Sequence, residues 1–281
     1  MKRFAIAVIF AAACARHTAA TAPVEINQGL QTPESVLWDP QQDVYFVSNV
    51  NGDPLAEDGN GFISRVNPDT LKIELKWVDG SKQGSHLDAP KGMAIVGDEL
   101  WVADINQVKK FDRRSGAPKG NVASPGAAFL NDLASDGTTA YVSDTGMGKG
   151  TDAVWQIRGN EPVKIASGTD LKEPNGLDIV NGRVWVVTYS GNELYDIESG
   201  KKANVARLPS GTLDGLVHLP DGTFLVASWD SSSVYRGPAA GPFNAVITGV
   251  KSPADIGYDS KRRRVLVPHF MENRVTIHPL Q

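Results

Sequence analysis

The sequence predicts an all-β protein with the architecture of a six-bladed β-propeller. One unit recurs six times in 281 residues: a Pro or Leu, a polar residue, a short apolar strand, a turn and a second apolar strand. Turn pairs such as Asn181-Gly182 and Asp221-Gly222 separate the two strands, and such pairs favour two-residue hairpins. No helical periodicity is sustained from Val24 onward.

The six copies share one phase, which is the signature of a repeat architecture. Successive copies begin 39 to 57 residues apart, that is, one unit plus insertions of different length. The position after the opening Pro or Leu is polar in five copies and an alanine in the sixth. These six equivalent positions form one set: Glu34, Lys91, Asn131, Asn175, Asp214 and Ala254.

The strands of each unit follow in order. The first strand opens with apolar residues, as in 36–38, 93–96, 177–180 and 216–219. The second is an almost continuous apolar run, at 44–47, 100–103, 140–143, 184–187, 224–227 and 265–268. A third recurs, as at 61–66, 152–157, 193–197 and 274–277. Because a strand that is apolar on both faces is buried on both sides, we expect blades stacked around an axis, which protects sheet edges.

The two ends of the chain fit a closed ring. The sixth unit ends after its third strand at Leu280, whereas residues 24–27 form a spare strand before the first unit. We predict that this N-terminal strand completes the last blade, so that residues 23–281 form one propeller domain.

Residues 1–22 are predicted to be a signal peptide. A positive start, Met1-Lys2-Arg3, precedes an apolar stretch from Phe4 to Ala13, which is too short to span a bilayer as a mature helix. Two cleavage hypotheses stay open. Ala20-Thr-Ala22 suits an ordinary signal peptidase, and Ala-Ala-Ala-Cys14 resembles a bacterial lipoprotein box that would add a lipid anchor at Cys14. We expect a periplasmic or secreted protein without a membrane span.

The composition excludes several classes of function. The net charge of −4 and the absence of a basic aromatic module give no footprint for nucleic acid. Cys14 is the only cysteine, so a mature chain has no disulfide.

Two loops are longer than a hairpin needs, 51–60 and 145–151. We expect them on one rim, as mobile surface loops or as gates over a site.

The shared phase of the repeat predicts a cation site. In a propeller, the starts of the innermost strands meet at the central channel, so equivalent positions converge there. Four members of the set carry oxygen: Glu34, Asn131, Asn175 and Asp214. Such donors suit Ca²⁺ or another hard divalent cation, and the absence of Cys and His disfavours softer metals. The alternative, mutual hydrogen bonding around a water-filled channel, stays open.

These units resemble the SMP-30/gluconolactonase/LRE family of calcium-dependent six-bladed propellers. The resemblance rests on Glu34, Asn131-Asp132, Pro174-Asn175-Gly176-Leu-Asp178 and Asp214-Gly215, and covers residues 30–280. It implies a catalytic Ca²⁺ held by Glu34, Asn131, Asn175 and Asp214, and hydrolysis of a lactone or related ester as a small-molecule substrate.

Two departures from the family pattern narrow the class of substrate that we expect. Sugar-lactone members carry an Arg where this chain has Phe129, and paraoxonases carry an acid for a second calcium where this chain has Ser35. We therefore expect a more apolar lactone or ester and assign Phe129 and Lys91 to the substrate-binding set.

Three residues are candidates for the catalytic step. Asp214 could attack or activate water, Asp132 could act as a general base beside Asn131, and His269 ends the second strand of the sixth unit. No Gly-x-Ser-x-Gly or His-Glu-x-x-His motif supports serine or zinc hydrolysis. Two other functions remain open: a non-catalytic propeller that binds a partner with a structural calcium, and a condensing enzyme resembling strictosidine synthase.

Overall fold

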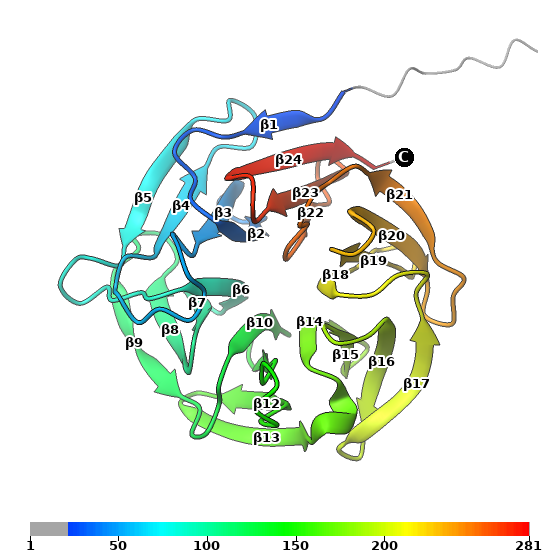
Figure 1. Ribbon diagram of the computed structural model, residues 1–281. Helices are drawn as coiled ribbons and strands as arrows, with labels where there is room; N and C mark the ends of the chain where they lie inside the picture. Colours follow the sequence, from blue (N-terminus) through cyan, green and yellow to red (C-terminus); the bar gives the residue numbers. More distant parts are fainter. Residues whose placement is uncertain (1–21, 281) are drawn as a thin grey trace, which may run out of the picture.

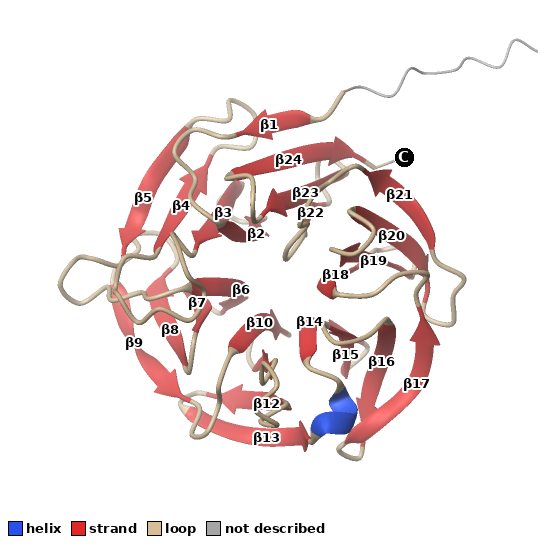
Figure 2. Ribbon diagram, viewed as in Figure 1, coloured by secondary structure: helices blue, strands red, loops and turns tan. Residues whose placement is uncertain are grey.

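The computed structural model describes residues 22–280, and the predicted signal peptide with Cys14 lies outside these residues except for Ala22. Six four-stranded antiparallel sheets surround a central axis (Figure 1). The predicted six-bladed propeller is therefore confirmed. Strands make up nearly all of the regular structure, and a single turn of 3₁₀ helix at Thr169–Leu171 stands out in Figure 2.

Each blade runs from an innermost strand at the axis to an outermost strand at the rim. The innermost strands are β2 (Pro33–Asp39), β6 (Pro90–Val96), β10 (Leu130–Ser135), β14 (Pro174–Val180), β18 (Leu213–His218) and β22 (Gly257–Asp259). The second strands are β3 (Val44–Asn49), β7 (Glu99–Asp104), β11 (Ala140–Asp144), β15 (Arg183–Thr188), β19 (Thr223–Ser228) and β23 (Arg264–His269). The third strands are β4 (Phe62–Val66), β8 (Gln107–Asp112), β12 (Ala153–Arg158), β16 (Glu193–Glu198), β20 (Ser233–Pro238) and β24 (Arg274–Pro279). The outermost strands are β5 (Ile73–Asp79), β9 (Pro118–Ala123), β13 (Glu161–Ser167), β17 (Lys201–Arg207), β21 (Asn244–Thr248) and β1 (Val24–Ile26).

The N-terminal strand closes the ring, as predicted. β1 pairs antiparallel with β24, with Glu25 opposite Thr276, and supplies the fourth strand of the last blade (Figure 1). Arg262 reinforces this closure, because its guanidinium donates to both carboxylate oxygens of Asp43 in the first blade at 2.8 Å.

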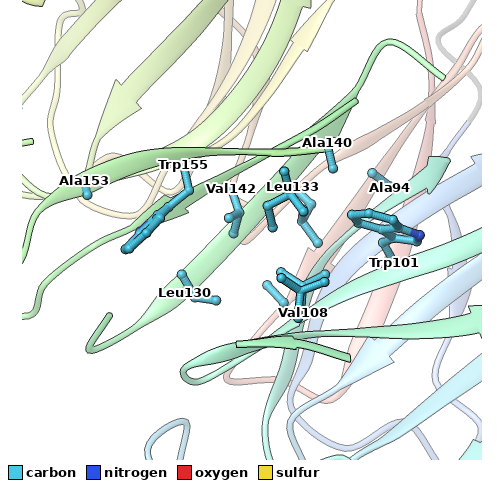
Figure 3. Close-up of a cluster of buried hydrophobic side chains, with 12 residues drawn as sticks. Ala94, Trp101, Val108, Leu130, Leu133, Ala140, Val142, Ala153 and Trp155 are labelled. Atoms are coloured by element: carbon cyan, nitrogen blue, oxygen red, sulfur yellow. The ribbon is translucent and has the colours of Figure 1, made fainter. Parts of the chain in front are cut away.

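The hydrophobic core lies between neighbouring blades. Figure 3 shows one cluster in which Trp101 and Val108 of the second blade pack against Leu133, Val142 and other residues of the third. This arrangement explains the continuous apolar runs of the second strands, since both faces of each blade are covered. No helix among residues 22–280 is long and apolar enough to cross a membrane.

The sixth innermost strand departs from the expected pattern. The repeat predicts that it starts near Pro253, but β22 begins only at Gly257. Pro253 still forms an isolated bridge with His269. Asp255 instead bridges to the first blade, because its backbone N–H donates to the carbonyl of Glu34 at 2.9 Å. Pro253 and Ala254 thus pair with β23 of their own blade while Asp255 pairs with the first blade, so this segment joins the two blades.

Candidate functional site

A β-bulge at the start of five of the innermost strands presents their repeated polar positions to the channel. In five blades the pairing of the first and second strands skips two residues opposite one. The skipped pairs are Glu34-Ser35, Lys91-Gly92, Asn131-Asp132, Asn175-Gly176 and Asp214-Gly215. Bulges re-aim side chains and are frequent beside functional sites. The polar positions that recur in the sequence are therefore the first residues of these bulges.

Glycine after the polar residue lets the innermost strands approach closely. A Cβ on Gly176 would lie 2.1 Å from the backbone oxygen of Asp214, and one on Gly215 would lie 2.2 Å from the backbone nitrogen of Ile256. Both distances are shorter than any van der Waals contact, so only glycine fits. The close approach brings the polar residues of neighbouring blades together.

Five of the six repeated positions line one cavity of about 220 Å³ at one end of the channel. Ala254 is buried and contributes no polar side-chain group. Phe129 lines the same cavity, as expected for the substrate-binding set, and so do Pro54 and Met147 from the two long loops, which therefore share a rim. The repeated positions in the cavity are Glu34, Lys91, Asn131, Asn175 and Asp214.

The hydrogen bonds around these side chains leave oxygen atoms free. Asn131 donates its amide nitrogen to Thr145 at 3.0 Å, and Asn175 donates to the backbone oxygen of Leu213 at 3.2 Å. Asp214 accepts a 2.8 Å hydrogen bond from the indole of Trp229 on Oδ2 only.

Three buried oxygen atoms at this site have no partner: Glu34 Oε2, Asn175 Oδ1 and Asp214 Oδ1. Buried polar atoms in proteins almost always have one, and leaving them without one is costly. Three such atoms on one cavity fit either a bound cation, which would take them as ligands, or ordered water, which would donate hydrogen bonds to them.

The pKa values of the two carboxyl groups on the cavity also favour a bound cation. Burial, and then the neighbouring Asp214, raise the pKa of Glu34 well above its usual value. Burial, followed by the charge of Asp255, raises the pKa of Asp214 to about 8. Burial and the neighbouring acids thus outweigh the attraction of Lys91 for Glu34, and a further positive charge would favour the ionised form of both carboxylates.

The donor set fits a hard divalent cation. Two carboxylates and two carboxamides offer the mixture of oxygens that Ca²⁺ takes. Among residues 22–280, no group of three or more His, Cys, Asp or Glu is arranged to hold a metal, and the two amides fall outside such a count. The cation site therefore stays a proposal based on the unpartnered oxygens.

Asp132 is not brought to this cavity. Its carboxylate accepts the backbone N–H groups of Leu133 and of Leu177 in the next blade, both at 2.6 Å. It lines a cavity of about 580 Å³ at the opposite end of the channel. Asp132 is therefore placed to join blades three and four rather than to reach a substrate beside Asn131.

His269 also lies apart from the cavity. Its ring is 1% exposed and is held between Glu272 at 3.1 Å and Thr276 at 2.8 Å. Burial lowers the pKa of this imidazole. Both ring nitrogens are thus occupied within the sixth blade, as expected for a residue that organises the end of a strand.

Sequence reasoning missed a second set of residues that line the cavity. Thr145, Tyr189, Trp229 and Phe270 each follow directly after the polar residue that ends a second strand. They share a phase of the repeat, so the same alignment of units that found Glu34 could have found them. Three are aromatic, and the rings of Trp229 and Phe270 lie 5.5 Å apart.

Comparisons with known proteins show the fold. No protein-family model matches the chain, and no curated protein matches it in sequence. Solved structures with the same fold include a gluconolactonase from Xanthomonas campestris, with 14% identity and a TM-score of 0.70 over 90% of this chain and 87% of that one. A luciferin-regenerating enzyme has 13% identity and a TM-score of 0.66 over 92% and 96%. A virginiamycin B lyase from Staphylococcus aureus has 14% identity and a TM-score of 0.64 over 92% and 99%.

Proposed function

We propose that the protein is an exported hydrolase of a small lactone or related ester, and that it depends on Ca²⁺ or another divalent cation. The observation that carries this proposal is the set of three unpartnered oxygens on one buried cavity. The gluconolactonase and the luciferin-regenerating enzyme, which share the fold, are consistent with it.

Glu34, Asn131, Asn175 and Asp214 would hold the cation. A bound divalent cation would supply Lewis acidity, which polarises an ester carbonyl and offsets the negative charge that develops on its oxygen. The amide nitrogens of both asparagines are held by protein acceptors, which leaves their oxygens available as ligands.

Asp214 is the best candidate for moving a proton. Trp229 fixes Oδ2 and leaves Oδ1 without a partner on the cavity. In this position Oδ1 can accept a proton from the attacking water. Asp132 and His269 are less suitable, because their polar atoms are engaged elsewhere.

Terbium luminescence tests the cation site without measuring activity. Trp229 contacts the carboxylate of Asp214, so excitation of tryptophan should sensitise Tb³⁺ bound there. Glu34→Gln and Asp214→Asn should each abolish this emission, and Ca²⁺ should displace Tb³⁺ from the wild type. Glu193→Gln is the matched control, since Glu193 is equally buried, is paired with Lys172 and Lys202, and does not line the cavity.

Hydrolysis of a panel of lactones and aryl esters, with and without a chelator, tests the reaction. We expect turnover that the chelator removes and Ca²⁺ restores, and no turnover in either site variant. Sensitised emission together with no turnover of any member would leave the non-catalytic binding module as the better hypothesis.

A further inference from the structure

Lys91 brings an ammonium group to the cavity that Glu34, Asn131, Asn175 and Asp214 line. It occupies the bulge position of the second blade and is 1% exposed. Its Nζ donates to the backbone oxygen of Ala89 at 2.9 Å and lies 4.3 Å from the centre of the Phe129 ring. An ammonium group has three hydrogens to donate, so Lys91 has capacity beyond the bond to Ala89.

Lys91 is the one cation among the described residues that line the cavity, where Glu34 and Asp214 are the other charged groups. Two carboxylates would balance a divalent cation by themselves. The buried carboxylates of Asp104 and Asp88 attract the Lys91 ammonium from outside the cavity, so the choice of an anion rests on the N–H groups that Lys91 has left to donate. A negatively charged group on the ligand would accept them as charge-assisted hydrogen bonds.

The walls of the cavity define the rest of such a ligand. Phe129, Tyr189, Trp229 and Phe270 provide flat apolar surface, on which rings pack in tilted or offset arrangements. The volume of about 220 Å³ is below the roughly 300–1,000 Å³ of pockets for drug-sized ligands. The ligand is therefore small, flat and largely apolar.

We propose that Lys91 determines substrate specificity, and that the substrate is a small lactone or ester with a flat apolar body and one carboxylate, which Lys91 binds. This inference rests on the proposed function for the reacting group. It gives Lys91 a positioning role, distinct from merely balancing Glu34.

Calorimetric titration with benzoate and benzamide, in saturating Ca²⁺, tests the anion site without turnover. The two probes share their shape and differ in charge. The wild type should bind benzoate at least about tenfold more tightly, the factor that one charge-assisted hydrogen bond typically provides. Lys91→Met keeps most of the length of the side chain without its charge, and it should remove this preference while changing benzamide affinity little.

Lys110→Met is the matched control. Lys110 also lies over an aromatic ring, 3.8 Å from the centre of Trp101, and donates to a backbone oxygen, that of Gly159. It does not line the cavity, so its variant should keep the preference for benzoate. Thermal unfolding of all variants checks folding, and Lys91→Gln serves as a second charge-removing variant.

Equal binding of the two probes by the wild type, or a preference that survives in Lys91→Met and Lys91→Gln, overturns the inference. Tighter Tb³⁺ binding by Lys91→Met with an unchanged preference would show that Lys91 only balances the acids, and overturns it as well. If the preference behaves as expected but no lactone is hydrolysed, the anion site stands and the proposed hydrolase alone fails. With turnover, the kcat/KM of a carboxylate-bearing γ-lactone should exceed that of its methyl ester, and Lys91→Met should reverse the order mainly through KM.

Discussion

Replacing Asp214 by asparagine should have opposite effects on the unfolding temperature in chelator and in Ca²⁺. Asparagine keeps the shape of the side chain, and its oxygen can still accept the hydrogen bond from Trp229. The variant removes an acidic group whose ionised form burial and Asp255 disfavour. It also puts an amide N–H₂ in place of the unpartnered Oδ1, where the neighbouring Glu34 carboxylate can accept a hydrogen bond from it. An unsatisfied buried polar group costs about 1–3 kcal/mol. In chelator, Asp214→Asn should therefore unfold at the same temperature as the wild type or higher.

The opposite order is expected when Ca²⁺ is added. A ligand at one hundred times its Kd stabilises a folded protein by about 2.7 kcal/mol. In a domain of this size, 1 kcal/mol shifts the Tm by about 2–4 °C, so Ca²⁺ should raise the wild-type Tm by about 5–10 °C. Asp214→Asn should lose most of this shift, because the ligand set loses one carboxylate.

Differential scanning calorimetry with chelator and with Ca²⁺ measures both effects. Asp259→Asn is the control, since Asp259 is a buried carboxylate engaged by Tyr45 and Arg262 away from the cavity. It should lower the Tm in both conditions and leave the Ca²⁺ shift intact. A Ca²⁺ shift of equal size in Asp214→Asn, or severe destabilisation of that variant in chelator, would refute the reasoning.

Three further predictions concern the ring and its closure. Ile26→Ala in β1 should cost about 2–5 kcal/mol in urea unfolding, whereas Val24→Ala, at a side chain 47% exposed, should cost under about 0.5 kcal/mol; equal costs would contradict the closure by β1. Gly176→Ala should destabilise by about 1–3 kcal/mol or more, because the added methyl meets the backbone of the next blade, and unchanged unfolding in urea would argue against that close approach. Arg262 holds the pKa of Asp43 well below its usual value, so its contribution is present above the unfolded pKa of about 4 and lost as the pH falls through the folded pKa. Asp43→Asn should therefore flatten the acid limb of stability against pH, and an unaltered limb would count against this pairing.

The sequence predicts the propeller and the places where most of its innermost strands start, because both recur in every unit of the repeat. The hairpin turns, the apolar second strands and the spare strand at Val24 each report a local property, and all agree on one architecture. The convergence of Glu34 with Asp214 follows from the shared phase alone. The sequence does not show which blades contact one another, so the late start of β22 was not predicted. Asp255 there pairs with the first blade, and no local pattern records a contact between blades.

Cavity composition was harder to predict than cavity position. Phe129 was assigned to substrate binding from the family resemblance and Lys91 from its place in the repeated set, and both line the cavity. Trp229 and Phe270 were overlooked because apolar residues after a strand look like core residues. Their exposure to a cavity depends on the loops that follow, whose paths are set by tertiary packing.

The bulge explains why neighbouring residues in the sequence serve different ends of the channel. In the third blade, Asn131 lines the smaller cavity and Asp132 the larger one. In the first blade, Glu34 and Ser35 divide in the same way. The first residue of each bulge thus supplies the site, and the second supplies contacts between blades, as Asp132 does when it accepts the N–H of Leu177. Proximity in sequence made Asp132 a candidate base, but alternation across the bulge turns its carboxylate away from the cavity. An acid that shares the cavity of Asn131 comes from another blade at the same phase, as Glu34 and Asp214 do, and of these two we propose Asp214 as the base.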